Sequence, residues 1–505
     1  MKKIGGKIRH LSNQLRAVFA SNPFFYATVI VFTISAGWVA TASLYPMAFD
    51  EEFHLGLIDI YARSWIPYGI EHTRDMAVYG PATADASYLM HYLLSFPYRL
   101  MDAIGVPFDT IVVVLRFINI AFVVTALVLF RKVLLEAGVS RAITHLSLAL
   151  FTLIPIFPML AGQINYDNLL LPIVALAFLC TVRISKTLVH QHRLPIMATW
   201  VLLITILLGM STKYAILPIA AGMALWLAFV VFRLRTQVSL VQLGSQFARS
   251  TRYLPVPKKL LIGVSLIVSL FFTFHYVDNY QRYGNPIPSC EEVFDETACM
   301  DYGPWRRNFN MKQSLSPTFE PVSLSEYTLQ DWLPGMSQRL TFALAGPTHT
   351  YQTKPPLPIL RTTLTVLTIL GAVCLAFVLF FTRNYRLLFG LTLLACALYV
   401  LPLVWRLYLA YVMTGEPVAV NGRYLLPVLP LVAASLIVAM QEVARRARVS
   451  RYMSFVASII LIILLGTGGG VATYIVQGES HWFWSGWGQG SHEVLQAIYS
   501  WFTLR

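Results

Sequence analysis

The fold is decided by the stretch FFYATVIVFTISAGWVATASLYPMAFDEEFHLGL, residues 24–57. It opens with a run of about twenty apolar residues, the length that an α-helix needs to span the ~30 Å hydrocarbon core of a bilayer. Three acids, Asp50, Glu51 and Glu52, follow directly, and His54 lies close behind them. Ionisable groups at membrane depth are costly, so this cluster predicts a functional site at the edge of a membrane.

Apolar runs of this kind recur along all 505 residues. Hydrophobic residues make up 57% of the chain and charged residues only 12%, whereas soluble domains carry roughly 25% charge. We therefore expect an all-α polytopic membrane protein with a single transmembrane domain over residues 1–505. About eleven spans are predicted, at residues 24–46, 110–130, 142–161, 168–185, 195–212, 214–232, 260–277, 357–381, 387–411, 424–441 and 452–475.

The distribution of charge predicts the orientation. With the N-terminus inside, the inner segments hold 23 of the 38 Lys and Arg residues, but only Glu136 and Glu442 among the 24 acids. By the positive-inside rule, this bias predicts a cytoplasmic N-terminus and an outer C-terminus. The net charge of +14 is then a topology signal with some attraction for anionic lipid heads. Nucleic-acid binding is not expected, because no basic patch with interleaved aromatics belongs to a soluble domain.

Two outer segments are too long to be simple turns, a first loop at residues 47–109 and a large loop at 278–356. An outer C-terminal tail is expected at residues 476–505. In the first loop, apolar residues such as Phe53 and Leu57 recur at helical spacing, which predicts helices lying in the membrane interface. The tail is rich in tryptophan, and it is either an aromatic belt at the outer interface or a cover over a lipid-facing cleft.

The five cysteines fall into two groups. Cys180, Cys374 and Cys396 lie inside apolar runs, where cysteine behaves as a small hydrophobic residue. Cys290 and Cys299 are nine residues apart in the large outer loop. They could form a disulfide, which would imply an oxidising outer compartment such as a periplasm.

The first candidate site is the acidic stretch itself. If a helix begins at Asp50, then Asp50 and His54 are four residues apart and Glu51 and His54 three, so acid and imidazole share one face. The helix dipole also favours acids at an N-terminus, which would be a purely structural reason for them. The functional alternative is a carboxylate that accepts the proton of a nucleophilic hydroxyl.

Two further motifs come to the same outer face. In GQINYDNLL, residues 162–170, Asp167 is either part of an Asn- and Asp-rich turn or a second carboxylate facing the same cavity. In VNGRYLLP, residues 420–427, Arg423 is either a snorkelling cation or a guanidinium placed to bind phosphate in a bidentate manner. Lys213, in the short link between two spans, is a weaker phosphate candidate.

Other ionisable residues lie in or beside the spans. Arg116 and Arg406 fall inside them, so each needs a partner or a polar cavity. His275, Asp278 and Tyr280 cluster at the outer end of the seventh span, as ligands or as interfacial residues. The chain contains neither a Walker loop nor a dinucleotide glycine fingerprint, so a nucleotide-driven pump is not indicated. A group donor acting outside would have to arrive in the membrane.

The three motifs carry a resemblance to a known superfamily. AFDEEFHLGL resembles the first-loop motif of protein O-mannosyltransferases and of the wider GT-C superfamily of integral-membrane glycosyltransferases. GQINYDNLLL and NGRYLLPVLPL resemble recurring segments of bacterial members, including domain of unknown function 2142 and relatives of the lipid A aminoarabinose transferase. The resemblance implies a polyprenyl-phosphate-linked sugar donor in the inner (plasma) membrane. It also implies inverting transfer, on the outer face, to a hydroxyl of a lipid, glycan or protein acceptor.

The resemblance also implies roles for individual residues. Asp50 would be the general base, with Glu51 as its acidic partner and Asp167 as the second acidic site, while Glu52 is an additional acid. The residues expected to contact substrate are Arg423, near the donor phosphate, and Lys213, His54, Tyr424 and Asn165. The soluble C-terminal domain of oligosaccharyltransferases and the luminal MIR domain of eukaryotic mannosyltransferases are not evident in the sequence.

Two alternatives stay open. No metal is required, but a divalent cation between Asp50 and Asp167 is compatible with the preference of hard cations for carboxylate oxygens. The chain could instead be a non-enzymatic lipid or glycan transporter that uses its outer acids as a proton or cation site. A transporter should concentrate ionisable residues near the midplane, with broken helices in two related halves, whereas the acids here crowd the outer interface.

Overall fold

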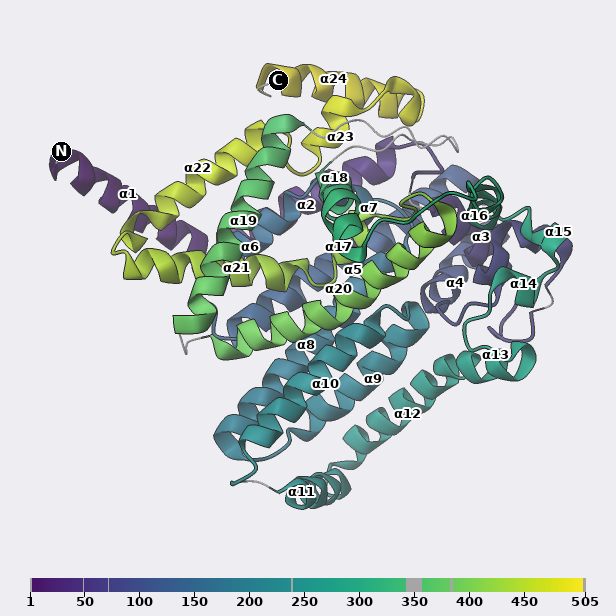
Figure 1. Ribbon diagram of the computed structural model, residues 1–505, viewed down its shortest axis with the longest axis horizontal. Helices are drawn as coiled ribbons and strands as arrows, with labels where there is room; N and C mark the ends of the chain where they lie inside the picture. The colour runs from purple at the N-terminus through teal and green to yellow at the C-terminus, as the bar shows by residue number, and fades with distance from the viewer. Residues whose placement is uncertain are drawn as a thin grey trace.

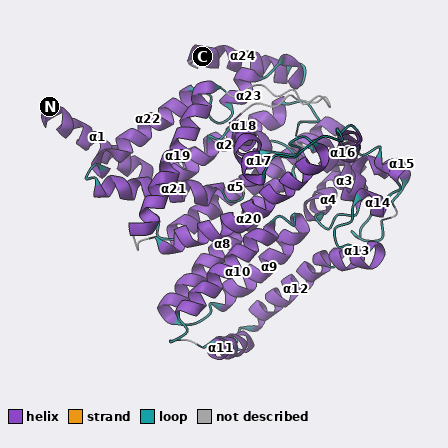
Figure 2. Cartoon of the chain, viewed as in Figure 1, coloured by secondary structure: helices purple, strands orange, loops and turns teal. Residues whose placement is uncertain are grey.

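The computed structural model describes residues 2–48, 50–70, 72–237, 239–341, 357–381 and 385–502. Every regular element in these ranges is helical, which confirms the expected all-α class (Figures 1 and 2). The helices up to the large outer loop are α1 (Lys2–Ala20), α2 (Asn22–Ala42), α3 (Glu51–Ala62), η1 (Arg74–Thr83), α4 (Leu89–Ala103), α5 (Phe108–Glu136), α6 (Arg141–Thr152), α7 (Ile156–Ala161), α8 (Tyr166–Gln191), α9 (Ile196–Thr212), α10 (Ile216–Arg233), α11 (Leu240–Arg252) and α12 (Val256–Thr273).

The remaining helices belong to the large loop, the later spans and the tail. They are α13 (His275–Tyr283), α14 (Cys290–Val293), α15 (Glu296–Cys299), α16 (Gly303–Gln313), α17 (Leu324–Tyr327), η2 (Thr328–Trp332), α18 (Leu333–Thr341), α19 (Pro358–Phe381), α20 (Arg386–Thr414), η3 (Gly422–Leu425), α21 (Leu429–Arg446), η4 (Ser450–Tyr452), α22 (Met453–Gly466), α23 (Ala472–Gln477), η5 (Ser480–Trp482) and α24 (Trp487–Phe502).

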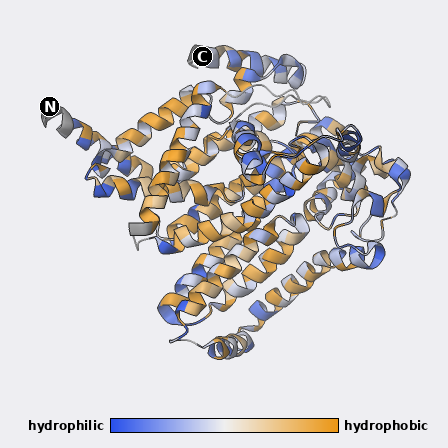
Figure 3. Cartoon of the chain, viewed as in Figure 1, coloured by the Kyte–Doolittle hydropathy of each residue, from blue (hydrophilic) through white to orange (hydrophobic). Residues whose placement is uncertain are grey.

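Within the described residues, seven helical segments are long and apolar enough to cross a membrane. Figure 3 shows hydrophobic residues along these helices. They are Asn22–Ala42, Phe108–Glu136, Tyr166–Gln191, Ile216–Arg233, Val256–Tyr283, Pro358–Leu379 and Arg386–Thr414, and two shorter apolar helices accompany them. The protein is therefore an integral membrane protein, as expected, but the count of eleven spans is not confirmed.

Two expected spans are broken in the structure. The apolar run at 142–161 is divided into α6 and α7, because Pro155 lacks a backbone N–H and cannot continue the α-helical hydrogen-bond ladder. The run at 452–475 is divided into α22 and α23 by the glycines that follow Thr467, of which Gly468 and Gly470 have positive φ. Average hydropathy does not register such breaks.

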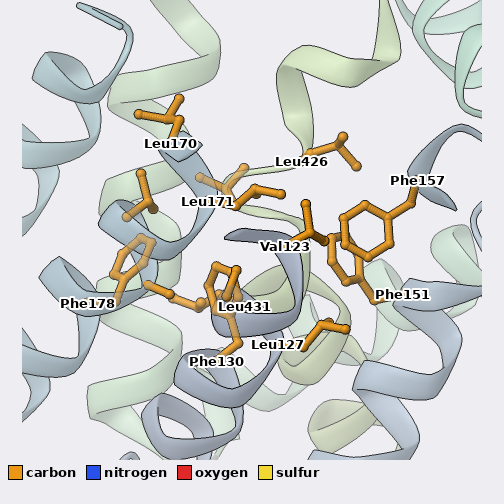
Figure 4. Packing of buried hydrophobic residues seen from close by; sticks show 14 of the residues in the cluster. Val123, Leu127, Phe130, Phe151, Phe157, Leu170, Leu171, Phe178, Leu426 and Leu431 are labelled. Atoms are coloured by element: carbon orange, nitrogen blue, oxygen red, sulfur yellow. The ribbon is translucent and has the colours of Figure 1, made fainter. Parts of the chain in front are cut away.

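The core is formed where α5 and α8 pack along each other (Figure 4). Val123, Leu127 and Phe130 of α5 meet Leu171 and Phe178 of α8 in one cluster of buried side chains. This cluster fixes the start of α8 against α5, and it therefore fixes the segment that carries Asp167.

The first loop contains the expected helix, but α3 is buried more deeply than a helix on the membrane surface. Leu55, Ile58 and Tyr61 are almost wholly inaccessible, since α4 and η1 cover this helix. At Gly56 a Cβ atom would lie 2.2 Å from the ring of Tyr79, so η1 approaches as closely as it does only because this residue is glycine.

The large loop folds back over the first loop. Cys290 and Cys299 form a disulfide, which confirms that the two can pair. Beside it, Arg74 of η1 forms ion pairs with Asp295 and Asp301 at 3.6 and 3.1 Å. Residues 342–356 of this loop and 503–505 of the tail lie outside the described residues.

The tail returns to the end of the first span. The backbone N–H of Leu44 donates to the carbonyl of Trp482 at 2.8 Å, and that of Trp484 donates to the carbonyl of Ala42 at 2.9 Å. Trp482 and Phe483 are each only 1% exposed. The tail therefore supports the segment that leads from α2 to the acidic stretch.

Candidate active site

Asp50 stands at the mouth of the site. It precedes α3 in a left-handed conformation with φ of 71°, and its side chain does not cap the helix. Instead, Asp50 Oδ2 lies 2.6 Å from Arg423 Nη2. The Asp50 side chain is 43% exposed, so its carboxylate is open to a second partner as well.

Glu51 is used differently, although it is the next residue. Its carboxylate is wholly buried and pairs in a bidentate manner with Arg116, at 2.8 Å from Nε and 2.7 Å from Nη2. The backbone N–H groups of Met47 and Ile164 also donate to it, at 2.7 and 3.0 Å. Glu51 therefore joins the acidic stretch to α5 and to the segment before α8, which is a positioning role.

Arg116 completes this buried connection. Its Nη1 donates to the carbonyls of Ala40 and Ser43 at 3.0 and 2.7 Å, at the end of α2. The arginine that the sequence placed inside a span thus has its partner. A buried charge needs such pairing and hydrogen bonding, because an isolated one would neutralise or unfold the segment.

Asp167 lies in the first turn of α8 and is 6% exposed. The side chain of Asn165 caps this helix by accepting the N–H of Asp167 at 2.9 Å, which is why the helix begins here. Asp167 Oδ1 lies 2.6 Å from Lys213 Nζ. Asn165 itself is buried and serves this turn.

Lys213 directly follows α9, and its side chain extends toward Asp167. Its ammonium lies 4.3 Å from the ring centre of Tyr166 and 5.2 Å from that of Tyr424. Burial lowers the pKa of Lys213 and the charge of Asp167 raises it, with a net upward shift that keeps the side chain protonated.

Arg423 occupies the centre of the site. Asn421 accepts the N–H of Arg423 at 3.1 Å, repeating the arrangement of Asn165 and Asp167. The guanidinium lies between the two acids, 2.6 Å from Asp50 and 3.9 Å from Asp167 Oδ2. With Lys213, these residues form a row of four alternating charges.

His54 lies behind this row and is not paired with an acid. Its Nδ1 lies 2.9 Å from His91 Nε2, and its ring meets Tyr166 edge to face. Burial lowers the pKa of His91 to about 3, while burial and the neighbouring His91 lower the pKa of His54 well below its usual value. The two imidazoles are therefore neutral at physiological pH.

The structure brings together Asp50, Asp167, Lys213, Arg423 and Tyr424. The expected face shared by Asp50 and His54 does not form, because α3 begins one residue later, at Glu51, and Asp50 turns toward η3. Within the described residues, no three metal-ligating side chains cluster. The guanidinium of Arg423 takes the position between the two carboxylates where a cation could have bridged them.

Sequence reasoning missed the aromatic residues around the row. Tyr302, from the large loop, packs edge to face on Phe53 at 5.8 Å, and burial followed by the charge of Asp50 raises its pKa to about 12. Tyr399 donates to the carbonyl of Tyr424 at 2.6 Å. Tyr399 lies inside an apolar run and Tyr302 is distant from the acidic stretch in the sequence, so only the fold places them beside the row.

The remaining candidates are not members of this row. Arg406 donates to the hydroxyl of Tyr214. His275 lies 3.2 Å from the carbonyl of Ala84, and Asp278 pairs with Arg282 at 3.0 Å. Tyr280 is 63% exposed, as an interfacial side chain would be.

Comparison with known proteins points to membrane glycosyltransferases. Residues 61–278 match the model of the dolichyl-phosphate-mannose-protein mannosyltransferase family, a range that contains Asp167 and Lys213. The match covers less than half of the chain and includes one of the three motifs, GQINYDNLLL; over these residues it confirms the resemblance to GT-C glycosyltransferases. No curated protein matches the chain.

Two solved structures of an archaeal oligosaccharyltransferase are also similar. One is the Archaeoglobus fulgidus enzyme tethered to an acceptor peptide, with a TM-score of 0.45, 14% identity and 91% of this chain covered. The other is AglB from the same organism in complex with an inhibitory peptide and a dolichol-phosphate, with a TM-score of 0.38, 14% identity and 95% covered. This chain spans only 55% and 56% of the length of those two chains.

Proposed function

We propose that the protein is a GT-C glycosyltransferase that transfers a sugar from a polyprenyl-phosphate-linked donor to a hydroxyl acceptor. Transfer would take place at the outer face of the plasma membrane and would invert the anomeric centre. The observation that carries the proposal is the row of Asp50, Arg423, Asp167 and Lys213. In this row, two acids and two cations alternate and contact one another.

The two cations suit the phosphate of such a donor. The departing polyprenyl phosphate leaves as an anion, so the site needs fixed positive charge more than an acid. Arg423 has five N–H donors in a planar fork, so it can contact Asp50 and a phosphate at the same time. Lys213 adds a second charge and stays protonated beside Asp167.

Asp50 is the proposed general base. Of Asp50, Glu51 and Asp167, only Asp50 is substantially open, at 43% exposure against 6% for Asp167 and none for Glu51. In the reaction its carboxylate takes the proton of the acceptor hydroxyl as that oxygen bonds to the anomeric carbon. The bond between this carbon and the phosphate oxygen breaks, and the phosphate leaves with the electron pair. One displacement of this kind inverts the centre.

The other acids have supporting roles in this proposal. Asp167 orients Lys213 and Arg423, while Glu51 holds the acidic stretch through Arg116, in place of the direct partnership that the resemblance implied. The ring of Tyr424 packs against the cations of Lys213 and Arg423. The proposed acceptor is a lipid, glycan or protein that presents a hydroxyl.

The choice of donor tests the proposal. Purified protein is incubated with a labelled polyprenyl-phosphate-sugar or with the corresponding nucleotide-sugar, together with candidate acceptors. We expect transfer from the lipid-linked donor only. Lys213→Gln should raise the KM for this donor about tenfold or more, the loss expected for a charge-assisted hydrogen bond of 1.5–3 kcal/mol. Transfer from the nucleotide-sugar, or an unchanged KM in the variant, would contradict the assignment.

A further inference from the structure

A cavity lies at the far ends of the helices that build the site. Its volume is about 490 Å³, and it is formed by the end of α8, the end of α10 and the start of α20. The same three helices, or the links beside them, carry Asp167, Lys213 and Arg423 at their opposite ends. They run side by side in the fold (Figure 1).

The two ends are separated by the thickness of a membrane. α8 has 26 residues, which at 1.5 Å per residue makes it about 39 Å long. It begins beside Asp167 and ends beside His190, a residue of the cavity. The cavity therefore lies at the membrane face opposite the proposed active site.

The cavity combines a cationic rim with an apolar wall. Lys186, Arg233 and Arg386 line it, and no acid is found among the described residues that do so. The wall includes Val189 and Phe229, which are 46% and 47% exposed on the helix surfaces. Charge at the rim and apolar surface beside it match the two parts of an anionic phospholipid.

The floor of the cavity is well defined. Trp226 Nε1 donates to Ser185 Oγ at 3.0 Å. Its ring lies so close to α20 that a Cβ atom on Gly390 would be 2.2 Å away. The nearest acid on α5, Glu136, is already paired with Arg183 at 2.9 Å, and Lys186 donates to the Glu136 carbonyl at 3.1 Å.

We propose that this cavity binds an anionic phospholipid from the leaflet opposite the active site. Arg233 and Arg386 contact the phosphate, and the acyl chains lie along Val189 and Phe229. A basic pocket between membrane helices is well suited to such headgroups, because the apolar surroundings strengthen the attraction between opposite charges. The bound lipid would hold α8, α10 and α20 together at this end.

Thermal unfolding of the full-length protein in neutral detergent tests the inference. Phosphatidylglycerol should raise the unfolding midpoint by several degrees, whereas phosphatidylcholine with the same acyl chains and inorganic phosphate should not. Arg233→Gln combined with Arg386→Gln should reduce the shift at least twofold. The matched control, Arg249→Gln with Arg252→Gln in exposed α11, removes equal charge at residues outside the cavity and should keep the full shift.

The opposite results would overturn the proposal that this cavity binds an anionic phospholipid. An undiminished phosphatidylglycerol shift in the double variant would place the lipid elsewhere, and an equal shift with inorganic phosphate would indicate a site for the free ion. Arg386→Gln alone changes an exposed first residue of α20, so it tests the same point if the double variant does not fold. Its shift should be smaller than that of the wild type, and an unchanged shift would count against the site.

Discussion

At the scale of single residues, neighbours in the sequence have separate tasks. Asp50 faces Arg423 and remains open, whereas Glu51 is enclosed by Arg116 and two backbone N–H groups. The difference arises because α3 begins between them, which turns the two carboxylates in different directions. In the proposed mechanism, Asp50 is the base and Glu51 is the residue that positions the acidic stretch.

The buried pair of Glu51 and Arg116 gives the first prediction. Glu51→Gln leaves the guanidinium buried without its counter-charge, so we expect the free energy of unfolding to fall by roughly 3–5 kcal/mol. Denaturant unfolding of the purified protein measures this. Glu136→Gln is the matched control, because its pair with Arg183 is partly exposed and should contribute only about 0–1 kcal/mol. Equal effects of the two changes would contradict the positioning role.

The sequence was informative about the charged residues of the site. Asp50, Asp167, Lys213 and Arg423 were all candidates because each is an ionisable group at the end of an apolar run, where charge is costly. The separate role of Glu51 could not be predicted, since its partner Arg116 is 65 residues away in the chain. The same holds for His91, which meets His54 only through the packing of α4 on α3.

At the scale of elements, the contact between α3 and α4 depends on two neutral imidazoles. Both histidines have pKa values below their ordinary value of about 6.5, and that of His91 falls to about 3. Between about pH 6.5 and pH 3, the unfolded chain therefore binds more protons than the folded one. Stability is fully present above about pH 6.5 and is lost as the pH falls toward 3.

This linkage predicts a pH-dependent unfolding midpoint. Below pH 6.5, each histidine should cost up to about 1.4 kcal/mol of stability per pH unit. The slope between pH 6.5 and 5 should be smaller in His91→Gln, which removes one of the two titrating groups. His10→Gln, in an exposed part of α1, should leave the slope unchanged. A slope that is the same in all three proteins would show that the pair does not carry this linkage.

The elements themselves were only partly predictable. Most of the predicted runs are largely helical in the structure, because a long apolar run has few alternatives to a membrane helix. The prediction of one helix each for residues 142–161 and 452–475 was wrong. Pro and Gly residues interrupt these helices but hardly change the mean hydropathy of the sequence. A helix at the position of α3 was predicted, but its burial was not. That burial depends on the packing of η1 over Gly56, where the ring of Tyr79 contacts the helix.

At the scale of the whole molecule, the proposed function requires the site to lie on the outer face of the membrane. Asp75 lies near the site end, and Gln246 lies in basic α11 at the other end. In a background with Cys180, Cys374 and Cys396 changed to alanine, an impermeant maleimide should label Asp75→Cys in intact cells. It should reach Gln246→Cys only after permeabilisation. The reverse pattern would contradict the orientation predicted from the basic inner loops.

The central claim is that Asp50 is the base of a sugar transfer, and one measurement tests it directly. The rate of transfer of labelled sugar from a polyprenyl-phosphate donor is compared for wild type, Asp50→Asn and Glu52→Gln. We expect Asp50→Asn to fold and to lose at least a hundredfold in kcat, the lower end of what general-base catalysis supplies. Glu52→Gln changes an exposed neighbouring acid and should remain close to wild type. A folded Asp50→Asn protein that transfers sugar at the wild-type rate would contradict the account.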